Sequence, residues 1–87
     1  MSLSYSKGSL TGSVEGLTLG TLVSTDGATF QKKMESFNFL TTQQEPIDET
    51  YFVMLYLDGT TVVGAIILPV VNTDFMVDIV VEYFISD

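Results

Sequence analysis

The chain has 87 residues, of which 46% are hydrophobic, and its formal net charge is −8 because eleven acidic side chains face only three basic ones. It contains no His, Cys, Arg or Trp, which excludes metal sites built from imidazole or thiolate, Ser-His or Cys-His nucleophiles, and a disulfide scaffold. Phosphate contacts depend on Lys and Arg, so a chain whose only bases are Lys7, Lys32 and Lys33 is poorly suited to bind nucleic acid or an anionic membrane directly. We therefore expect no enzymatic activity, no cofactor and no small-molecule substrate.

This length predicts a single domain over residues 1–87, with residues 1–7 as a candidate flexible N-terminal arm. The first eight residues lack the apolar core of a signal peptide. We therefore expect no secretion by that route, and a location in a virion or in host cytoplasm. The longest apolar run, residues 62–71, has about half the length of a membrane span.

The first quarter of the chain alternates in the manner of a strand. From residue 8 to residue 16, Gly, Leu and Val take turns with Ser, Thr and Glu. The phase of the alternation changes after Gly16. The pattern predicts strands near 8–14 and 17–24, with a tight turn or a bulge at Glu15-Gly16.

The stretch that follows the turn signal Thr25-Asp26-Gly27 supports two interpretations. Phe30, Met34 and Phe37 have the spacing of one short amphipathic helix near 28–37, with Thr25 or Asp26 as its cap. The aromatic and β-branched residues at both ends of the stretch instead favour a strand. We favour the strand and keep the helix as the alternative.

Residues 41–49 are polar and contain Pro46, so they are predicted to form a loop. Glu45, Asp48 and Glu49 form the one local acidic cluster that a hard cation could use. Their spacing does not match a calcium-binding loop, and we interpret them as solvated acids.

A hairpin is the clearest signal in the sequence. The aromatic and β-branched run 51–57 is followed by Asp58-Gly59, a strong turn dipeptide, and by a second apolar run, 60–68. A two-residue turn at 58–59 predicts three facing pairs on one side of the ribbon, namely Leu55 with Val62, Val53 with Gly64, and Tyr51 with Ile66. Both sides of this ribbon are apolar. We expect the rest of the chain to cover one side and a neighbouring subunit to cover the other.

Pro69 is expected to end the second strand, because it cannot donate a hydrogen bond to the ladder. A turn is predicted at 72–74, followed by a long strand over 75–85 whose odd-numbered residues form an apolar face. A helix there would stack Asp74, Asp78 and Glu82 in one column of like charge. Together these elements predict an all-β fold, a small antiparallel sandwich or barrel of six to eight strands with the option of one short helix near 28–37.

A chain this short buries only about 60–65% of its unfolded surface, so this much apolar material is expected to be partly covered by other molecules. The predicted function is a non-enzymatic structural or assembly protein that forms a homo-oligomer or docks on a larger assembly. By analogy of size and composition alone, a minor capsid, cement or decoration protein of a virus or phage fits this description. The predicted interface residues are Tyr51, Val53, Leu55, Val62, Ile66 and Tyr83.

Two alternatives remain open at this stage. The first is a small acidic inhibitor that binds a basic protein partner by imitating the charge of DNA, which requires carboxylates arrayed along one surface. The second is a barrel that encloses an apolar ligand, for which 87 residues leave little room.

Overall fold

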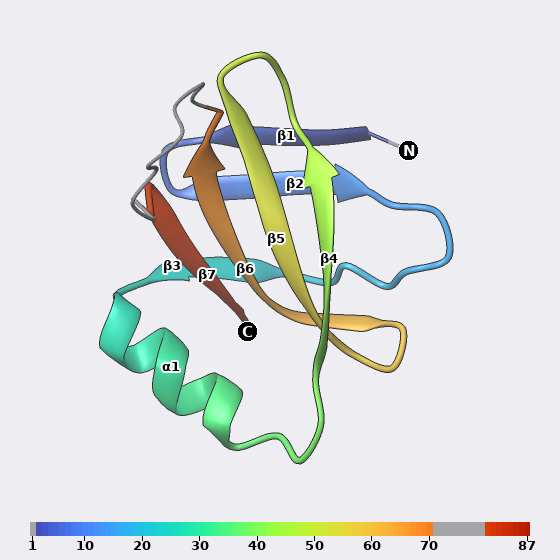
Figure 1. The fold of residues 1–87 in the computed structure, drawn as a ribbon, viewed down its shortest axis with the longest axis vertical. Helices are drawn as coiled ribbons and strands as arrows, with labels where there is room; N and C mark the ends of the chain where they lie inside the picture. The colour runs from blue at the N-terminus through green and yellow to red at the C-terminus, as the bar shows by residue number, and fades with distance from the viewer. Residues whose placement is uncertain (1, 71–79) are drawn as a thin grey trace.

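The computed structural model describes residues 2–70 and 80–87, and in these residues seven strands form two antiparallel sheets with one short helix (Figure 1). A two-stranded hairpin consists of β1 (Ser2–Ser6) and β2 (Ser9–Ser13). The second sheet has the strand order β3-β7-β6-β5-β4. Its strands are β3 (Leu22–Thr25), β4 (Thr41–Pro46), β5 (Tyr51–Asp58), β6 (Thr61–Pro69) and β7 (Glu82–Ser86), and the helix is α1 (Gly27–Glu35). The predicted small antiparallel all-β fold of six to eight strands is confirmed.

The preferred strand over residues 28–37 is wrong, because the chain forms α1 there. Asp26 is the N-cap, and its carboxylate accepts a hydrogen bond of 2.7 Å from the backbone N–H of Thr29. Lys32 and Lys33 lie in the last turn, where positive charge is favourable to the helix dipole. These local signals outweigh the strand propensity of the flanking residues.

The N-terminal segment also differs in part from its prediction. Within the candidate arm 1–7, residues 2–6 form β1, which pairs antiparallel with β2. A turn at 15–16 is present, and there the Leu17 N–H donates to the Val14 carbonyl at 3.1 Å. The strand predicted over 17–24 is confined to β3, and ahead of it Thr18 makes a single parallel bridge to Thr61.

The predicted loop over 41–49 is wrong in its first two thirds, because residues 41–46 form β4 beside β5. The register runs from Thr41 opposite Leu57 to Pro46 opposite Phe52. Polar side chains are tolerated on an edge strand because its backbone ladder with β5 supplies the hydrogen bonds and solvent reaches the free side.

The predicted hairpin is present, but its register is wrong. Gly59 has a φ of +68° and opens a two-residue connection, so that Asp58 faces Thr61 and Leu57 faces Val62. The register then shifts between Tyr56 and Leu57. The shift places one extra residue in β6. Beyond it, each side chain of β6 therefore points to the face opposite to the one predicted.

The pairings beyond the bulge therefore differ from the prediction. Tyr56 faces Gly64, Leu55 faces Ala65 and Val53 faces Ile67. Gly64 consequently lies on the opposite side of the sheet from Val53, and the predicted contact between these two residues does not exist.

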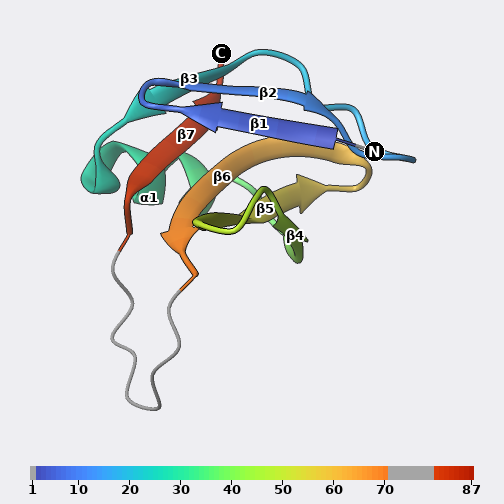
Figure 2. The same cartoon turned by 90° about the horizontal axis from the view of Figure 1, so that it is seen from above.

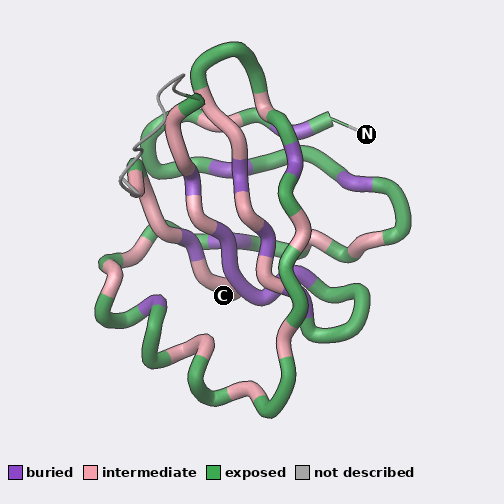
Figure 3. Tube along the Cα trace, in the orientation of Figure 1, coloured by how far each residue is buried: buried purple, intermediate pink, exposed green. Residues whose placement is uncertain are grey.

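The core lies between the β1–β2 hairpin and one face of the five-stranded sheet. Figure 2 shows the hairpin stacked across this sheet, and Figure 3 shows the buried positions concentrated in β5 and β6. We call the face of the sheet that packs against the hairpin the inner face, and the opposite one the outer face. The core contains Leu3, Leu10, Val14, Leu22, Val53, Leu55, Leu57, Val62, Ala65, Ile67 and Phe84.

The C-terminal strand prediction holds for part of its length. Pro69 is the last residue of β6, as expected, and β7 begins at Glu82. The predicted turn at 72–74 and the predicted strand residues 75–79 lie outside the described residues. Within β7 it is the even-numbered Phe84 that is fully buried in the core, whereas the odd-numbered face that we expected to be apolar lies on the outer face.

A substitution at Gly64 tests the packing of α1 on the outer face. A Cβ at this position would come within 2.7 Å of Met34 Cε and 3.0 Å of Phe30 Cε1. Gly64→Val is expected to lower the free energy of unfolding by about 1–3 kcal/mol, because α1 has to move away from the sheet. Urea denaturation measures the loss, and it should shrink when Met34→Ala is introduced together with Gly64→Val. Equal losses in the two backgrounds would contradict this packing.

Candidate functional site

The register of the five-stranded sheet defines three rows of side chains on the outer face, because facing residues of neighbouring strands point to the same side. The first row contains Pro46, Phe52 and Leu68; the second contains Gln44, Met54, Ile66, Tyr83 and Thr25; the third contains Thr42, Tyr56, Gly64, Ile85 and Val23. In every row the residues of the central strands β5 and β6 are apolar or aromatic. Neither central strand places a charged side chain in these rows.

The helix α1 covers only one end of this face. The ring of Phe30 packs against Tyr56 and Tyr83, with a centroid distance of 5.2 Å in each case. Burial raises the pKa of Tyr56, and the neighbouring Tyr83 adds to the increase. A hollow of about 410 Å³ lies beside the helix, and its lining includes Phe30, Met34, Tyr56 and Tyr83. Tyr56, Gly64 and Tyr83 are therefore packed against α1, whereas Val23 at the far edge of the third row is 38% exposed.

The other end of the outer face has no such cover from α1. We call Phe52, Met54, Ile66 and Leu68 the outer strip. These four side chains form two facing pairs across β5 and β6, and all four are partly exposed. Val81, whose N–H donates to the Ile67 carbonyl at 2.8 Å, is 41% exposed immediately before β7. The outer strip is thus a continuous apolar surface in contact with solvent.

The structure separates the predicted interface residues into two groups. Val53, Leu55 and Val62 are at most 1% exposed and lie in the core, so their side chains do not face outward in this fold. Tyr51 packs against the core from the inner face. Ile66 and Tyr83 lie side by side on the outer face.

Sequence reasoning missed Phe52, Met54 and Leu68 as members of the exposed surface. The alternation of β5 did assign Phe52 and Met54 to one common face. The position of the bulge decides which residues of β6 point to the inner face and which to the outer face. The apolar run 62–68 contains no polar residue that would signal this position.

A second group of side chains converges on Glu82 at the inner face. The Tyr5 hydroxyl donates to Glu82 Oε1 at 2.5 Å, and the Gly8 N–H donates to the same oxygen at 3.1 Å. The Ser24 hydroxyl donates to Glu82 Oε2. One carboxylate of β7 is therefore bonded to the β1–β2 hairpin and to β3, and it also borders a hollow of about 470 Å³ that Lys7 helps to line.

These contacts change the acidity of both partners. Burial alone would raise the pKa of Glu82, but the hydrogen bonds from Ser24, Tyr5 and Gly8, together with the charge of Lys7, lower it below its ordinary value of 4.5. Burial, the hydrogen bond to Glu82 and the negative charge of Glu82 raise the pKa of Tyr5 to about 12. Over the physiological pH range, Glu82 therefore stays ionised and accepts hydrogen bonds, while Tyr5 stays neutral and donates one.

The acidic cluster at 45–49 does not form one site. Glu45 is buried on the inner side of β4, where it accepts a hydrogen bond of 2.6 Å from the Gln43 side chain. Asp48 accepts bonds from the backbone N–H groups of Thr50 and Tyr51 at 2.7 and 2.8 Å. The interpretation as solvated acids is therefore wrong for Glu45. Across residues 2–70 and 80–87, no group of three or more carboxylates is placed to hold a metal ion.

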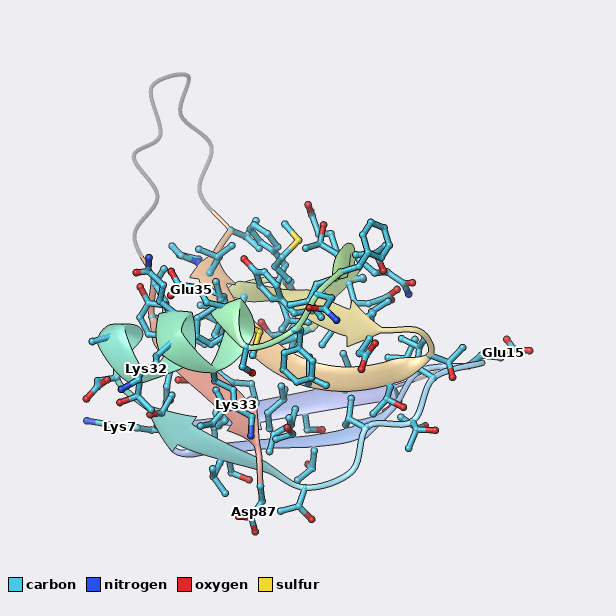
Figure 4. The ribbon with its side chains drawn as sticks, turned by 90° about the horizontal axis from the view of Figure 1, so that it is seen from below. Lys7, Glu15, Lys32, Lys33, Glu35 and Asp87 are labelled. Atoms are coloured by element: carbon cyan, nitrogen blue, oxygen red, sulfur yellow. The ribbon has the colours of Figure 1, made fainter. Side chains whose placement is uncertain are left out.

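The charged groups are distributed over different sides of the molecule. In Figure 4, Lys32 and Lys33 extend from α1 toward the side on which β1, β2 and β3 lie. The same view shows Glu15, Glu35 and Asp87 pointing in three different directions. The described part of the chain also has no helix with the length and apolar character of a membrane span. Comparison with protein-family models, with curated proteins and with solved structures found no match to this chain.

The pH dependence of stability tests the role of Glu82. Its pKa is lower in the folded than in the unfolded chain, so its contribution is complete above the unfolded value and is lost as the pH falls through the folded value. Glu82→Gln is expected to cost about 1–3 kcal/mol at pH 7, and the difference from the unsubstituted protein should shrink below about pH 4. Urea denaturation at a series of pH values measures both.

Glu45→Gln is the matched control, because the side chain that donates to Glu45, that of Gln43, lies on the same strand. If Glu82→Gln and Glu45→Gln lowered stability equally at every pH, Glu82 would have no special role in joining the two sheets.

Proposed function

We propose that this protein is a non-enzymatic structural protein that self-associates, or docks on a larger protein assembly, through the outer strip. The observation that carries the proposal is the partial exposure of Phe52, Met54, Ile66 and Leu68 on a sheet face that α1 covers at one end only. Contiguous apolar patches on small proteins mark contact surfaces, because burying them against a partner removes apolar area from water.

The chemistry of the strip indicates the kind of partner. Its side chains are apolar and include a flexible methionine and an aromatic ring, which are enriched at the centres of protein interfaces. No charged residue lies in the three rows of the outer face, so the matching surface should also be apolar and binding should be insensitive to salt. Such a partner is another protein. The assembly that we favour is a viral shell, to which this chain would attach as a minor capsid, cement or decoration protein.

The acidic-inhibitor alternative finds less support. Imitation of DNA needs carboxylates in a row, whereas Asp48 lies ahead of the first residue of β5 and Asp58 is its last residue. Glu82 and Glu45 are engaged in hydrogen bonds. Asp74 and Asp78 lie outside the described residues. The net charge of −8 then serves to keep copies with an apolar surface in solution.

One lysine in the outer strip and one beside it test the proposal. Leu68→Lys combined with Val81→Lys should weaken self-association at least about tenfold, because an ammonium group would have to be desolvated at the contact. The long lysine stems lie along the apolar surface while their charges reach water, so the fold itself should tolerate them. Sedimentation velocity over a range of concentrations, in low salt and in high salt, measures the association.

The matched control is Thr11→Lys with Ser13→Lys, which adds the same charge at exposed positions of β2 in the other layer. Association of the control should equal that of the unsubstituted protein. A protein that stays monomeric at all concentrations would count against self-association, and an equal loss in both double variants would count against the outer strip as the contact surface.

A further inference from the structure

The β1–β2 hairpin is attached to the rest of the molecule without a backbone ladder. β1 and β2 pair only with each other, and within the described residues no hydrogen bond between two backbone groups joins residues 2–13 to the five-stranded sheet. The attachment consists of side-chain contacts and of one bond from a backbone N–H to a carboxylate. Leu3 and Leu10 enter the core, and Tyr5 donates to Glu82, as the Gly8 N–H also does.

The connection between the hairpin and the sheet contains a sharply defined hinge. Thr18 is held in both directions, since its N–H donates to the Thr60 carbonyl at 2.8 Å and its carbonyl accepts from the Val62 N–H at 2.9 Å. The chain ahead of it folds back through the exposed turn at Glu15-Gly16, where Gly16 has a φ of +83°. Any movement of the hairpin away from the sheet is therefore concentrated in residues 14–17.

If the hairpin moved away, the apolar surface beneath it would be exposed to water, which is unfavourable. Val53, Leu55 and Phe84 are fully buried there, and Glu82 would lose two of its three donors. This surface is complementary to a hairpin that carries two leucines, the Tyr5 hydroxyl and the Gly8 N–H at the positions they have in the closed chain. A second copy of this chain carries such a hairpin.

We propose that the β1–β2 hairpin exchanges between two copies, so that the hairpin of each copy covers the inner face of the other and donates to its Glu82. The contacts that residues 2–13 make with the sheet form again between the two chains, and only residues 14–17 change their conformation. In this pair the buried residues Val53 and Leu55 become contact residues between copies. This exchange goes beyond docking through the outer strip and does not depend on it.

Two glycines provide a matched test. Gly16 and Gly20 both have positive φ, +83° and +64°, and at neither position would an added Cβ meet another atom within 4 Å. Valine strongly disfavours such φ values. Gly16→Val should therefore extend the hinge and favour the exchanged pair. Gly20→Val should not, because Gly20 follows Thr18, which is hydrogen-bonded to the five-stranded sheet on the far side of the hinge.

The experiment compares both variants by sedimentation velocity in a chain that also carries Leu68→Lys and Val81→Lys, so that association through the outer strip does not contribute. Gly16→Val is expected to form dimers that separate only slowly on dilution, because each hairpin must leave its site first, and Gly20→Val is expected to stay monomeric. Equal behaviour of the two variants would overturn the proposal. If Gly16→Val does not fold, Gly16→Ala has the same φ preference and is assessed by the same criterion.

A mixing experiment identifies the exchange itself. One chain carries Gly16→Val and Tyr5→Phe, and the other carries Gly16→Val and Glu82→Gln, so that each alone lacks the bond between Tyr5 and Glu82. After the two are unfolded and refolded together, an exchanged heterodimer holds one intact Tyr5–Glu82 pair. The mixture should therefore melt at a higher temperature than either chain alone. A mixture that melts as the sum of its two parents would show that the dimers form without exchange.

Discussion

The burial of one side of the β5–β6 ribbon against the β1–β2 hairpin is the interaction on which the rest of the structure depends. Both sides of the ribbon are apolar. The β1–β2 hairpin covers one side, and the smaller element α1 covers part of the other. The hairpin packs Leu3 and Leu10 on the inner face, and Val14 follows directly after it, whereas α1 reaches only one end of the outer face. A small chain cannot cover two wide apolar faces completely, and the uncovered remainder is the outer strip.

The bulge in β6 determines which residues form that remainder. Without it, Gly64 and Ile66 would share the inner face with Val53; with it, they lie on the outer face, where Gly64 leaves room for Phe30 and Met34. The edge strand β4 limits how the molecule can associate. It ends in Pro46 and turns the side chain of Glu45 inward, and both features discourage pairing with a further strand. Association through a face is therefore favoured over association through this edge.

The elements that the sequence predicts well are those specified by neighbouring residues. The turn after Asp58 and the end of β6 at Pro69 each depend on residues within a few positions of one another. The cap of α1 at Asp26 is also local, but the sequence predicts it only in the alternative, helical interpretation of residues 28–37. The bulge in β6 brings Gly64 to the face where α1 packs, and β4 pairs with β5, so both features involve residues distant in sequence and are not predicted from local pattern. The bonds to Glu82 join residues as much as 77 positions apart, and no local pattern signals them.

The central claim is that copies whose own β1–β2 hairpin is in place meet a partner through the outer strip, and not through the inner face of the same ribbon. Methyl NMR spectra recorded over a range of protein concentrations test it most directly, because the two faces carry different methyl groups. The account predicts concentration-dependent shifts at Met54, Ile66 and Leu68, with the signals of Leu57 and Ala65 unchanged. Spectra without any concentration dependence at the outer-strip methyl groups, or shifts that begin at Leu57 and Ala65, would contradict it.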